Sequence, residues 1–222
     1  MKPERKLAET TLPSGARLML HEHDGSYAIR LNGQTLMLSA QSASELLLGE
    51  LAVAGPADCV LVGGLGLGFS LRSVLAKTGP TAKIHVAELI PQIVDWNREF
   101  LTGINGKLVD DPRVTIFPDD VWNVLVHANR ARYDALLLDI DNGPTAMVQQ
   151  PNARLYKSSG IQLLLAALKP GGRAAIWSAV EDHAFADRLV LAGFRVEGKA
   201  HKLYEKAKRN GCVIYVADKP PQ

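Results

Sequence analysis

Five acidic residues stand just after the ends of predicted strands: Glu88, Asp119, Asp120, Asp139 and Asp141. Carboxylates at such positions can accept hydrogen bonds from ribose hydroxyls or an adenine amino group, and they can hold an ammonium or take its proton. Ligands of open α/β sheets bind outside the carboxyl ends of the strands. We therefore expect these side chains to line a ligand-binding edge.

A glycine loop precedes the first of these acids. In "GGLGLGF" the glycines are Gly63, Gly64, Gly66 and Gly68. Without a Cβ, the backbone can turn sharply off a strand and touch a ligand at the start of the next helix. A dinucleotide fingerprint read from this loop has Phe69 in place of its third glycine, which disfavours NAD. A turn that serves only strand–helix packing is the alternative.

Glu88 ends the next predicted strand, 22 residues after Gly66. At this distance from a glycine loop, a carboxylate commonly binds both ribose hydroxyls of an adenosine cofactor. A surface acid that caps the helix after Pro91 is the alternative. We assign Glu88 and the neighbouring Leu89 to the predicted cofactor site, together with the four glycines.

The segment "PDD" places Asp119 and Asp120 after the next strand. An acid here could accept a hydrogen bond from an adenine amino group. Capping of a helix that begins at Val121 explains the same residues, and one carboxylate could do both. Both residues are predicted cofactor ligands.

The strand "LLLDIDNGP" carries Asp139 and Asp141 beyond its apolar part. In an alkyl transfer from a sulfonium to an amine, Asp139 would hold the ammonium, accept its proton and align the lone pair with the reacting carbon. We predict both acids as catalytic residues, with Asp139 also touching the cofactor. Asn142, Tyr156 and Trp177 are predicted to face the acceptor, and core packing is the alternative for the two aromatics.

Two modules are predicted to position these residues, the first over residues 1–55. Residues 16–39 alternate apolar and polar side chains and contain two Asx–Gly dipeptides, which predict a three-stranded antiparallel meander. Ser42 and Glu45 in "SASE" have the spacing of a capping box for a helix that runs to about Ala54.

The second predicted module, residues 56–222, alternates strands and helices. Five apolar strands begin near residues 58, 82, 113, 133 and 173, the last after a helix stopped by "PGG", and two more strands end the chain. Continuous apolar strands between helices predict a parallel sheet covered on both faces. A mostly parallel, seven-stranded Rossmann-like α/β sheet that ends in an antiparallel hairpin is typical of class I S-adenosylmethionine-dependent transferases.

Composition narrows the expected partners. The 222 residues include 25 Lys plus Arg and 23 Asp plus Glu, so no large positive field favours nucleic acid or an anionic membrane. Two cysteines in apolar runs, with no apolar signal segment or membrane span, lead us to expect a cytoplasmic protein that acts on a small molecule. His21 and His23 have no third ligand nearby, so no metal site is expected.

The sequence resembles the spermidine synthase superfamily of polyamine aminopropyltransferases over nearly its whole length, and within it a bacterial spermidine synthase-like branch. The segments that carry the likeness are "DGSYAIRLNGQ", "SELLLGE", "VLVGGLGLG", "VAELIPQIVDWN", "DPRVTIFPDD", "YDALLLDIDNGP" and "LKPGGRAAIWS". The resemblance implies that Glu88 binds ribose, that Asp120 lies by adenine and that Asp139 is the catalytic base. It also implies a possible homodimer through the N-terminal meander.

Two departures from the family pattern affect the predicted reaction. Where this chain has Gly66, the family's loop has an aspartate that anchors the amine of decarboxylated S-adenosylmethionine. The family's Tyr-His-Glu segment, which lines the polyamine site, appears here as Leu48, Gly49 and Glu50. Because an aspartate would repel the carboxylate of intact S-adenosylmethionine, its loss leads us to predict methyl transfer from that cofactor to a small molecule such as an amine. Aminopropyl transfer from the decarboxylated cofactor and a non-catalytic cofactor-binding partner are the alternatives.

Overall fold

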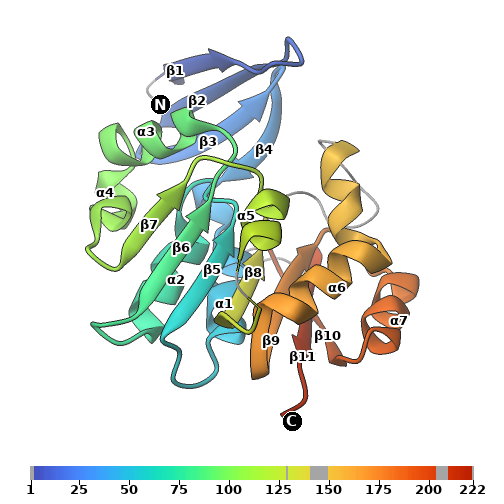
Figure 1. Cartoon of the computed structure of the whole chain (residues 1–222). Helices are drawn as coiled ribbons and strands as arrows, with labels where there is room; N and C mark the ends of the chain where they lie inside the picture. The colour runs from blue at the N-terminus through green and yellow to red at the C-terminus, as the bar shows by residue number, and fades with distance from the viewer. Residues whose placement is uncertain (1–2, 129, 141–149, 204–209, 222) are drawn as a thin grey trace.

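The chain folds around two β-sheets (Figure 1). The computed structural model describes residues 3–128, 130–140, 150–203 and 210–221. The N-terminal sheet has four strands in the order β1-β2-β3-β4, and the larger sheet has seven in the order β10-β11-β9-β8-β5-β6-β7.

The N-terminal sheet contains one strand more than the sequence predicted. Its strands are β1 (Arg5–Thr11), β2 (Arg17–His23), β3 (Ser26–Leu31) and β4 (Gln34–Leu38). The predicted three-stranded meander over residues 16–39 is confirmed as β2, β3 and β4. The additional strand β1 was not predicted, because it is an edge strand whose side chains are all exposed or half-buried, so its sequence shows no clear apolar alternation. Both Asx–Gly turns are confirmed, since residues 24, 25, 32 and 33 all have positive φ, as tight hairpin turns require.

The helix α1 (Ala43–Ala52) follows the N-terminal sheet, as predicted. The predicted capping box is wrong, because Ser42 makes no side-chain hydrogen bond to the helix N-terminus. The Glu45 carboxylate instead accepts a hydrogen bond from Ser44 Oγ at 2.6 Å. This leaves the Glu45 side chain for a different role.

A close contact joins α1 to α2 (Phe69–Lys77). A Cβ on Gly49 would lie 2.5 Å from Ser73 Cβ, so only glycine lets the two helices approach this closely. The contacts of α1 extend to three strands of the larger sheet. The boundary between two modules at residue 55 stays a prediction.

The larger sheet has the predicted Rossmann-like α/β arrangement. Its strands are β5 (Cys59–Gly63), β6 (Lys83–Ala87), β7 (Val114–Phe117), β8 (Tyr133–Leu138), β9 (Leu168–Ser178), β10 (Arg195–His201) and β11 (Cys212–Asp218). The five strands from β7 to β9 are parallel, and β11 lies between β9 and β10, antiparallel to both. Chain order reverses between β5 and β8, which is where open α/β sheets bind ligands.

Helices cover both faces of this sheet (Figure 1). The remaining helices are α3 (Pro91–Glu99), α4 (Thr102–Asn105), α5 (Val121–His127), α6 (Ser158–Ala167) and α7 (His183–Leu191), with 3₁₀ turns η1 (Ser39–Gln41), η2 (Leu108–Asp110) and η3 (Gln150–Tyr156). Ala135 and Leu137 of β8 join a core with α1, α2, α3 and the N-terminal sheet. Leu136 and Leu138 join a second core with α5, α6 and α7. This alternation explains why β8 is apolar from Ala135 to Leu138.

The strand β9 begins earlier than predicted. It starts at Leu168, directly after α6, so the "PGG" segment lies within the strand and does not stop the helix. Leu168 pairs with Tyr133, but Arg173 pairs with Ala135, and Gly171 between them has a φ of 75°. The glycines therefore serve a bulge in the strand.

The described residues contain neither a candidate membrane span nor a candidate metal site. Within them, no helix is long and apolar enough to cross a membrane, and no group of three His, Cys, Asp or Glu side chains is placed to bind a metal ion. Cys59 is half-buried, Cys212 is buried, and both are free thiols.

The contact at Gly49 gives a stability prediction. In a helix, Gly→Ala ordinarily stabilises by about 1 kcal/mol, but Gly49→Ala is expected to lower the free energy of unfolding by about 1–3 kcal/mol because its methyl group meets Ser73. Thermal or urea denaturation measures the change. Gly55→Ala is the control, since a Cβ there meets nothing within 4 Å. Equal stability of the two variants would show that the helices adjust at no cost.

Candidate active site

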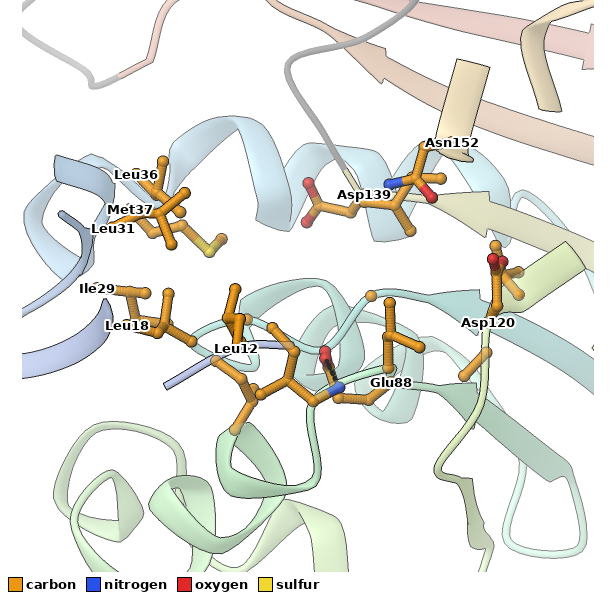
Figure 2. Close-up of a pocket in the computed structure, with 18 of the residues that line it drawn as sticks. Leu12, Leu18, Ile29, Leu31, Leu36, Met37, Glu88, Asp120, Asp139 and Asn152 are labelled. Atoms are coloured by element: carbon orange, nitrogen blue, oxygen red, sulfur yellow. Dashed lines mark hydrogen bonds between the residues drawn. The ribbon is translucent and has the colours of Figure 1, made fainter. Parts of the chain in front are cut away.

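A pocket lies between the N-terminal sheet and the carboxyl ends of the parallel strands (Figure 2). The structure brings four of the five predicted acids together in its lining, and Asp141 lies outside the described residues, as does Asn142. The acidic residues that line the pocket are Glu45, Glu88, Asp119, Asp120 and Asp139. Their roles toward a ligand stay predictions.

The glycine loop forms part of the lining through two of its four glycines. Gly64, Gly66 and Gly68 have φ values of 88°, 50° and 88°, which glycine adopts without strain. A Cβ on Gly64 would collide with the backbone carbonyl of Asp139, so the loop touches the segment after β8. Gly63 packs within the core, and Gly68 is the N-cap of α2. These two glycines therefore serve strand–helix packing, which was the alternative to ligand contact.

Glu88 is buried against the glycine loop, with only 7% of its surface exposed. Its Oε2 accepts a hydrogen bond from the Leu65 N–H and its Oε1 from the Ile90 N–H, both at 2.9 Å. Burial raises the pKa of Glu88, and the N–H donors oppose this rise. Each oxygen retains a further lone pair, so Glu88 can fix the loop and also accept a ligand hydroxyl. Leu89 beside it also lines the pocket.

Asp120 lies at the end of the pocket opposite the N-terminal sheet residues (Figure 2). Its Oδ1 accepts the Trp122 N–H at 2.8 Å, so the helix-capping alternative is correct for this residue. Its Oδ2 accepts a hydrogen bond from Arg154 at 2.6 Å. Asp119, also in the lining, accepts a hydrogen bond from Asn123 Nδ2 at 2.8 Å. Both acids can therefore meet a ligand only through their remaining lone pairs.

Asp139 follows β8 and is paired with a second acid. Ser70 Oγ donates a hydrogen bond to Asp139 Oδ2 at 2.6 Å. Burial raises the pKa of Asp139, and the Ser70 hydrogen bond opposes the rise. Burial and the charge of Asp139 together raise the pKa of Glu45 to about 7. The pair can therefore take up a proton near neutral pH.

Sequence reasoning missed two residues of this cluster. The spacing of Glu45 predicts a capping box, and no motif singles out Ser70 within its helical segment. The signal for Glu45 was its place in the segment "SELLLGE", which carries the family likeness. No spacing rule could place Ser70, because its contact with Asp139 depends on how α2 packs beside β8.

The two predicted acceptor-side aromatics lie in different places. Trp177 lines the pocket. Tyr156 is 3% exposed, lies outside the pocket lining and packs edge-on against Phe185 at 5.6 Å between ring centroids. Tyr156 is therefore a core residue, in agreement with the alternative to its predicted place beside the acceptor.

Six aliphatic side chains line the end of the pocket near the N-terminal sheet, and we call them the apolar wall. They are Leu12, Leu18, Ile29, Leu31, Leu36 and Met37 (Figure 2). No sequence pattern points directly to this wall, because the alternation of these residues predicts a buried sheet face without saying what it faces.

The charge of the pocket is strongly one-sided. Five carboxylates line it, and among the described residues no Lys, Arg or His does. Arg154 pairs with Asp120 from outside the lining, which leaves the remaining acids without a cation in the pocket itself. The site therefore favours a ligand that carries positive charge.

Comparison with known proteins places the chain in a family. The model of the spermine/spermidine synthase domain matches residues 47–200. The chain therefore belongs to the spermine/spermidine synthase family, as its motifs indicated. The predicted membership of the spermidine synthase superfamily is confirmed.

Relatives and solved structures agree with this assignment. A polyamine aminopropyltransferase of Mycobacterium tuberculosis is 33% identical over 54% of this chain and 23% of its own, and one of Aeropyrum pernix is 27% identical over 73% and 52%. The chain thus spans about a quarter to a half of these relatives. A crystal structure of spermidine synthase in complex with the transition state analogue AdoDATO superimposes with a TM-score of 0.70 at 20% identity, covering 98% of this chain and 75% of that one. This last likeness shows the shared fold.

The acid pair gives a prediction about stability and pH. The folded-state pKa of Glu45, about 7, lies above its ordinary value of 4.5. Its ionisation therefore destabilises the fold above pH 7, and this penalty disappears as the pH falls from about 7 toward 4.5. Glu45→Gln is expected to raise Tm above that of the natural protein at pH 8 and to leave it nearly unchanged at pH 4.5.

Thermal denaturation of the ligand-free protein at several pH values measures this difference. Glu50→Gln, a change at an exposed glutamate on the same helix, is the matched control and should give a difference that does not vary with pH. A Glu45→Gln difference that is also independent of pH would show that the carboxylates do not repel each other.

Proposed function

We propose that this chain transfers the aminopropyl group of decarboxylated S-adenosylmethionine to a small amine. The charge of the pocket is the main support, because five carboxylates and no described basic side chain line it. The decarboxylated cofactor carries a sulfonium and an ammonium but no carboxylate, and the amine acceptor is also a cation. Both substrates suit an acidic lining. The relatives named as polyamine aminopropyltransferases agree with this reaction.

Methyl transfer from intact S-adenosylmethionine, the reaction predicted from Gly66, is less well supported. The absence of an acid at position 66 removes one source of repulsion toward the cofactor carboxylate. Glu45 and Asp139 still line the same pocket and would repel that carboxylate. The alternative, aminopropyl transfer, therefore replaces methyl transfer as the leading proposal.

The glycine loop also offers little to a ligand carboxylate. The Gly64 N–H donates to the Ala87 carbonyl at 2.9 Å, and the Gly68 N–H donates to the Leu65 carbonyl at 2.8 Å. The Leu65 N–H donates to Glu88. These donors are used within the protein, so the argument that bare backbone amides would hold the carboxylate of intact S-adenosylmethionine does not apply to them.

Asp139 is the proposed base. The cofactor supplies a propyl carbon bonded to a sulfonium, which leaves as the neutral thioether methylthioadenosine. Asp139 holds the acceptor ammonium, takes one proton from it and directs the lone pair toward that carbon. A C–N bond forms as the C–S bond breaks, and the product is a secondary ammonium. Ser70 keeps the Asp139 carboxylate oriented, and Glu45 adds negative charge beside the ammonium.

The adenosine part of the cofactor is proposed to lie over the strand ends. Glu88 is the proposed ribose ligand, because it is fixed by two backbone donors and lines the pocket. Asp119 and Asp120 form the proposed adenine end, and Leu89 supplies an apolar contact for the base. Gly64 and Gly66 allow the cofactor to approach the backbone closely.

Ligand preference tests the proposal directly. Calorimetric titration is expected to show decarboxylated S-adenosylmethionine binding at least tenfold more tightly than the intact cofactor, since the intact cofactor adds a carboxylate to an acidic pocket. Glu88→Ala is expected to weaken binding about 10- to 100-fold, and Glu50→Gln is the control. Tighter binding of the intact cofactor would restore methyl transfer. Tight binding without methylthioadenosine release in the presence of any amine would favour a non-catalytic partner.

The role of Asp139 as base gives a separate prediction. Asp139→Asn keeps an oxygen that can accept the Ser70 hydrogen bond but cannot take a proton, so kcat should fall about 10²- to 10⁴-fold. Methylthioadenosine release measures the rate, and calorimetry with the decarboxylated cofactor measures binding in the same variant. Loss of binding as large as the loss of rate would show that Asp139 only holds the cofactor.

A further inference from the structure

The apolar wall is fixed in place by backbone pairing. Leu18 pairs with Leu31 across β2 and β3, and Ile29 pairs with Met37 across β3 and β4. Paired residues of antiparallel strands present their side chains on the same face. The wall is therefore a rigid surface of the N-terminal sheet.

A bulge in β4 enlarges this surface. Ile29 pairs with Met37, but Arg30 pairs with Thr35, so Leu36 is an extra residue in β4. Neighbours in a regular strand point to opposite faces. The bulge instead lets both Leu36 and Met37 line the pocket.

Met37 brings the wall into contact with the glycine loop. Its Sδ lies 2.5 Å, and its Cε 2.8 Å, from the place that a Cβ on Gly66 would take. Met37 therefore fills the space that any side chain at position 66 would need. A carboxylate at that position is incompatible with this placement of Met37.

Charge and apolar surface occupy different parts of the pocket. Figure 2 shows the labelled wall residues at one end, Asp120 at the other, and Glu88 and Asp139 between them. The wall carries no carboxylate, hydroxyl or amide side chain. Among the described residues, the wall offers no partner to a second ammonium placed against it, and burial of an unpaired ammonium is strongly unfavourable.

We propose that the acceptor is a primary monoamine with an aliphatic body. Its ammonium lies at Glu45 and Asp139, and its hydrocarbon part lies against the apolar wall. This inference rests on the proposed aminopropyl transfer and specifies its acceptor. Each methylene that the wall buries should raise kcat/KM about fourfold. A second ammonium at the far end of the chain should lower kcat/KM at least tenfold.

Four amines of matched length test this inference. They are butylamine, hexylamine, 1,4-diaminobutane and 1,6-diaminohexane, each with decarboxylated S-adenosylmethionine as co-substrate. We expect kcat/KM from methylthioadenosine release to be about 15-fold higher for hexylamine than for butylamine, and at least tenfold higher for hexylamine than for the diamine of equal length. Calorimetric binding of each amine to protein saturated with methylthioadenosine provides a readout that does not need turnover.

A charge placed in the wall tests the cause of this preference. Met37→Glu should shift the hexylamine to 1,6-diaminohexane ratio at least tenfold toward the diamine, because it supplies a partner for the second ammonium. Thr35→Glu adds the same charge to β4 at an exposed residue outside the pocket lining, and should leave the ratio unchanged. Equal shifts in the two variants would mean that general charge, and not the wall, determines the preference.

The failure of this inference can be told apart from failure of the proposed function. If any amine supports methylthioadenosine release but the diamines are preferred, the inference is overturned and the aminopropyl transfer stands. If hexylamine binds more tightly than the diamine, and Met37→Glu reverses this order while no amine is alkylated, the wall recognises an aliphatic amine and the proposed transfer fails. Equal binding of hexylamine and 1,6-diaminohexane would falsify the inference without reference to turnover.

Discussion

The contact between the glycine loop and the backbone after β8 is the constraint on which the site depends. The Asp139 N–H donates to the Gly63 carbonyl at 2.9 Å, and no Cβ fits between Gly64 and the Asp139 carbonyl. Glu88 is attached to the same loop through the Leu65 N–H. The proposed base and the proposed ribose ligand are therefore held by one short segment, and their separation is set by backbone contacts rather than by flexible side chains.

This arrangement concentrates negative charge, and the fold compensates for only part of it. Arg154 neutralises Asp120 from outside the pocket, and Ser70 and backbone N–H groups support Asp139 and Glu88. Burial still raises the pKa of Glu45, Glu88 and Asp139, which means that their ionised forms are unfavourable in the empty protein. A cationic substrate relieves this cost when it binds. The same electrostatic strain that lowers stability therefore contributes to recognition of the proposed substrates.

The sequence was informative where local pattern determines structure. Alternating apolar strands and helices predicted the larger sheet, and its strand ends located Glu88, Asp120 and Asp139. It was uninformative where a contact depends on packing between distant segments, as for Ser70 and the apolar wall. It was misleading where one pattern has two uses: "PGG" serves a bulge in β9, and the spacing that suggested a capping box at Glu45 belongs to a pocket acid. Strand β1 was not predicted, because an exposed edge strand lacks the apolar alternation on which strand prediction depends.

The two halves of the pocket depend on different structural features, and this difference affects which acceptor the pocket can bind. The proposed adenosine half comes from strand ends of one sheet, so its positions follow from the β-α-β order. The proposed acceptor half depends on how the N-terminal sheet packs over that sheet. Leu48 is fully buried in the core and Gly49 is packed against α2, so neither of these positions lines the pocket. Met37 occupies the space that a Cβ at position 66 would take, so an acid at position 66 does not fit with this placement of Met37. A side chain at position 66 therefore requires the thioether end of Met37 to move, which links the residue type in the loop to the shape of the apolar wall.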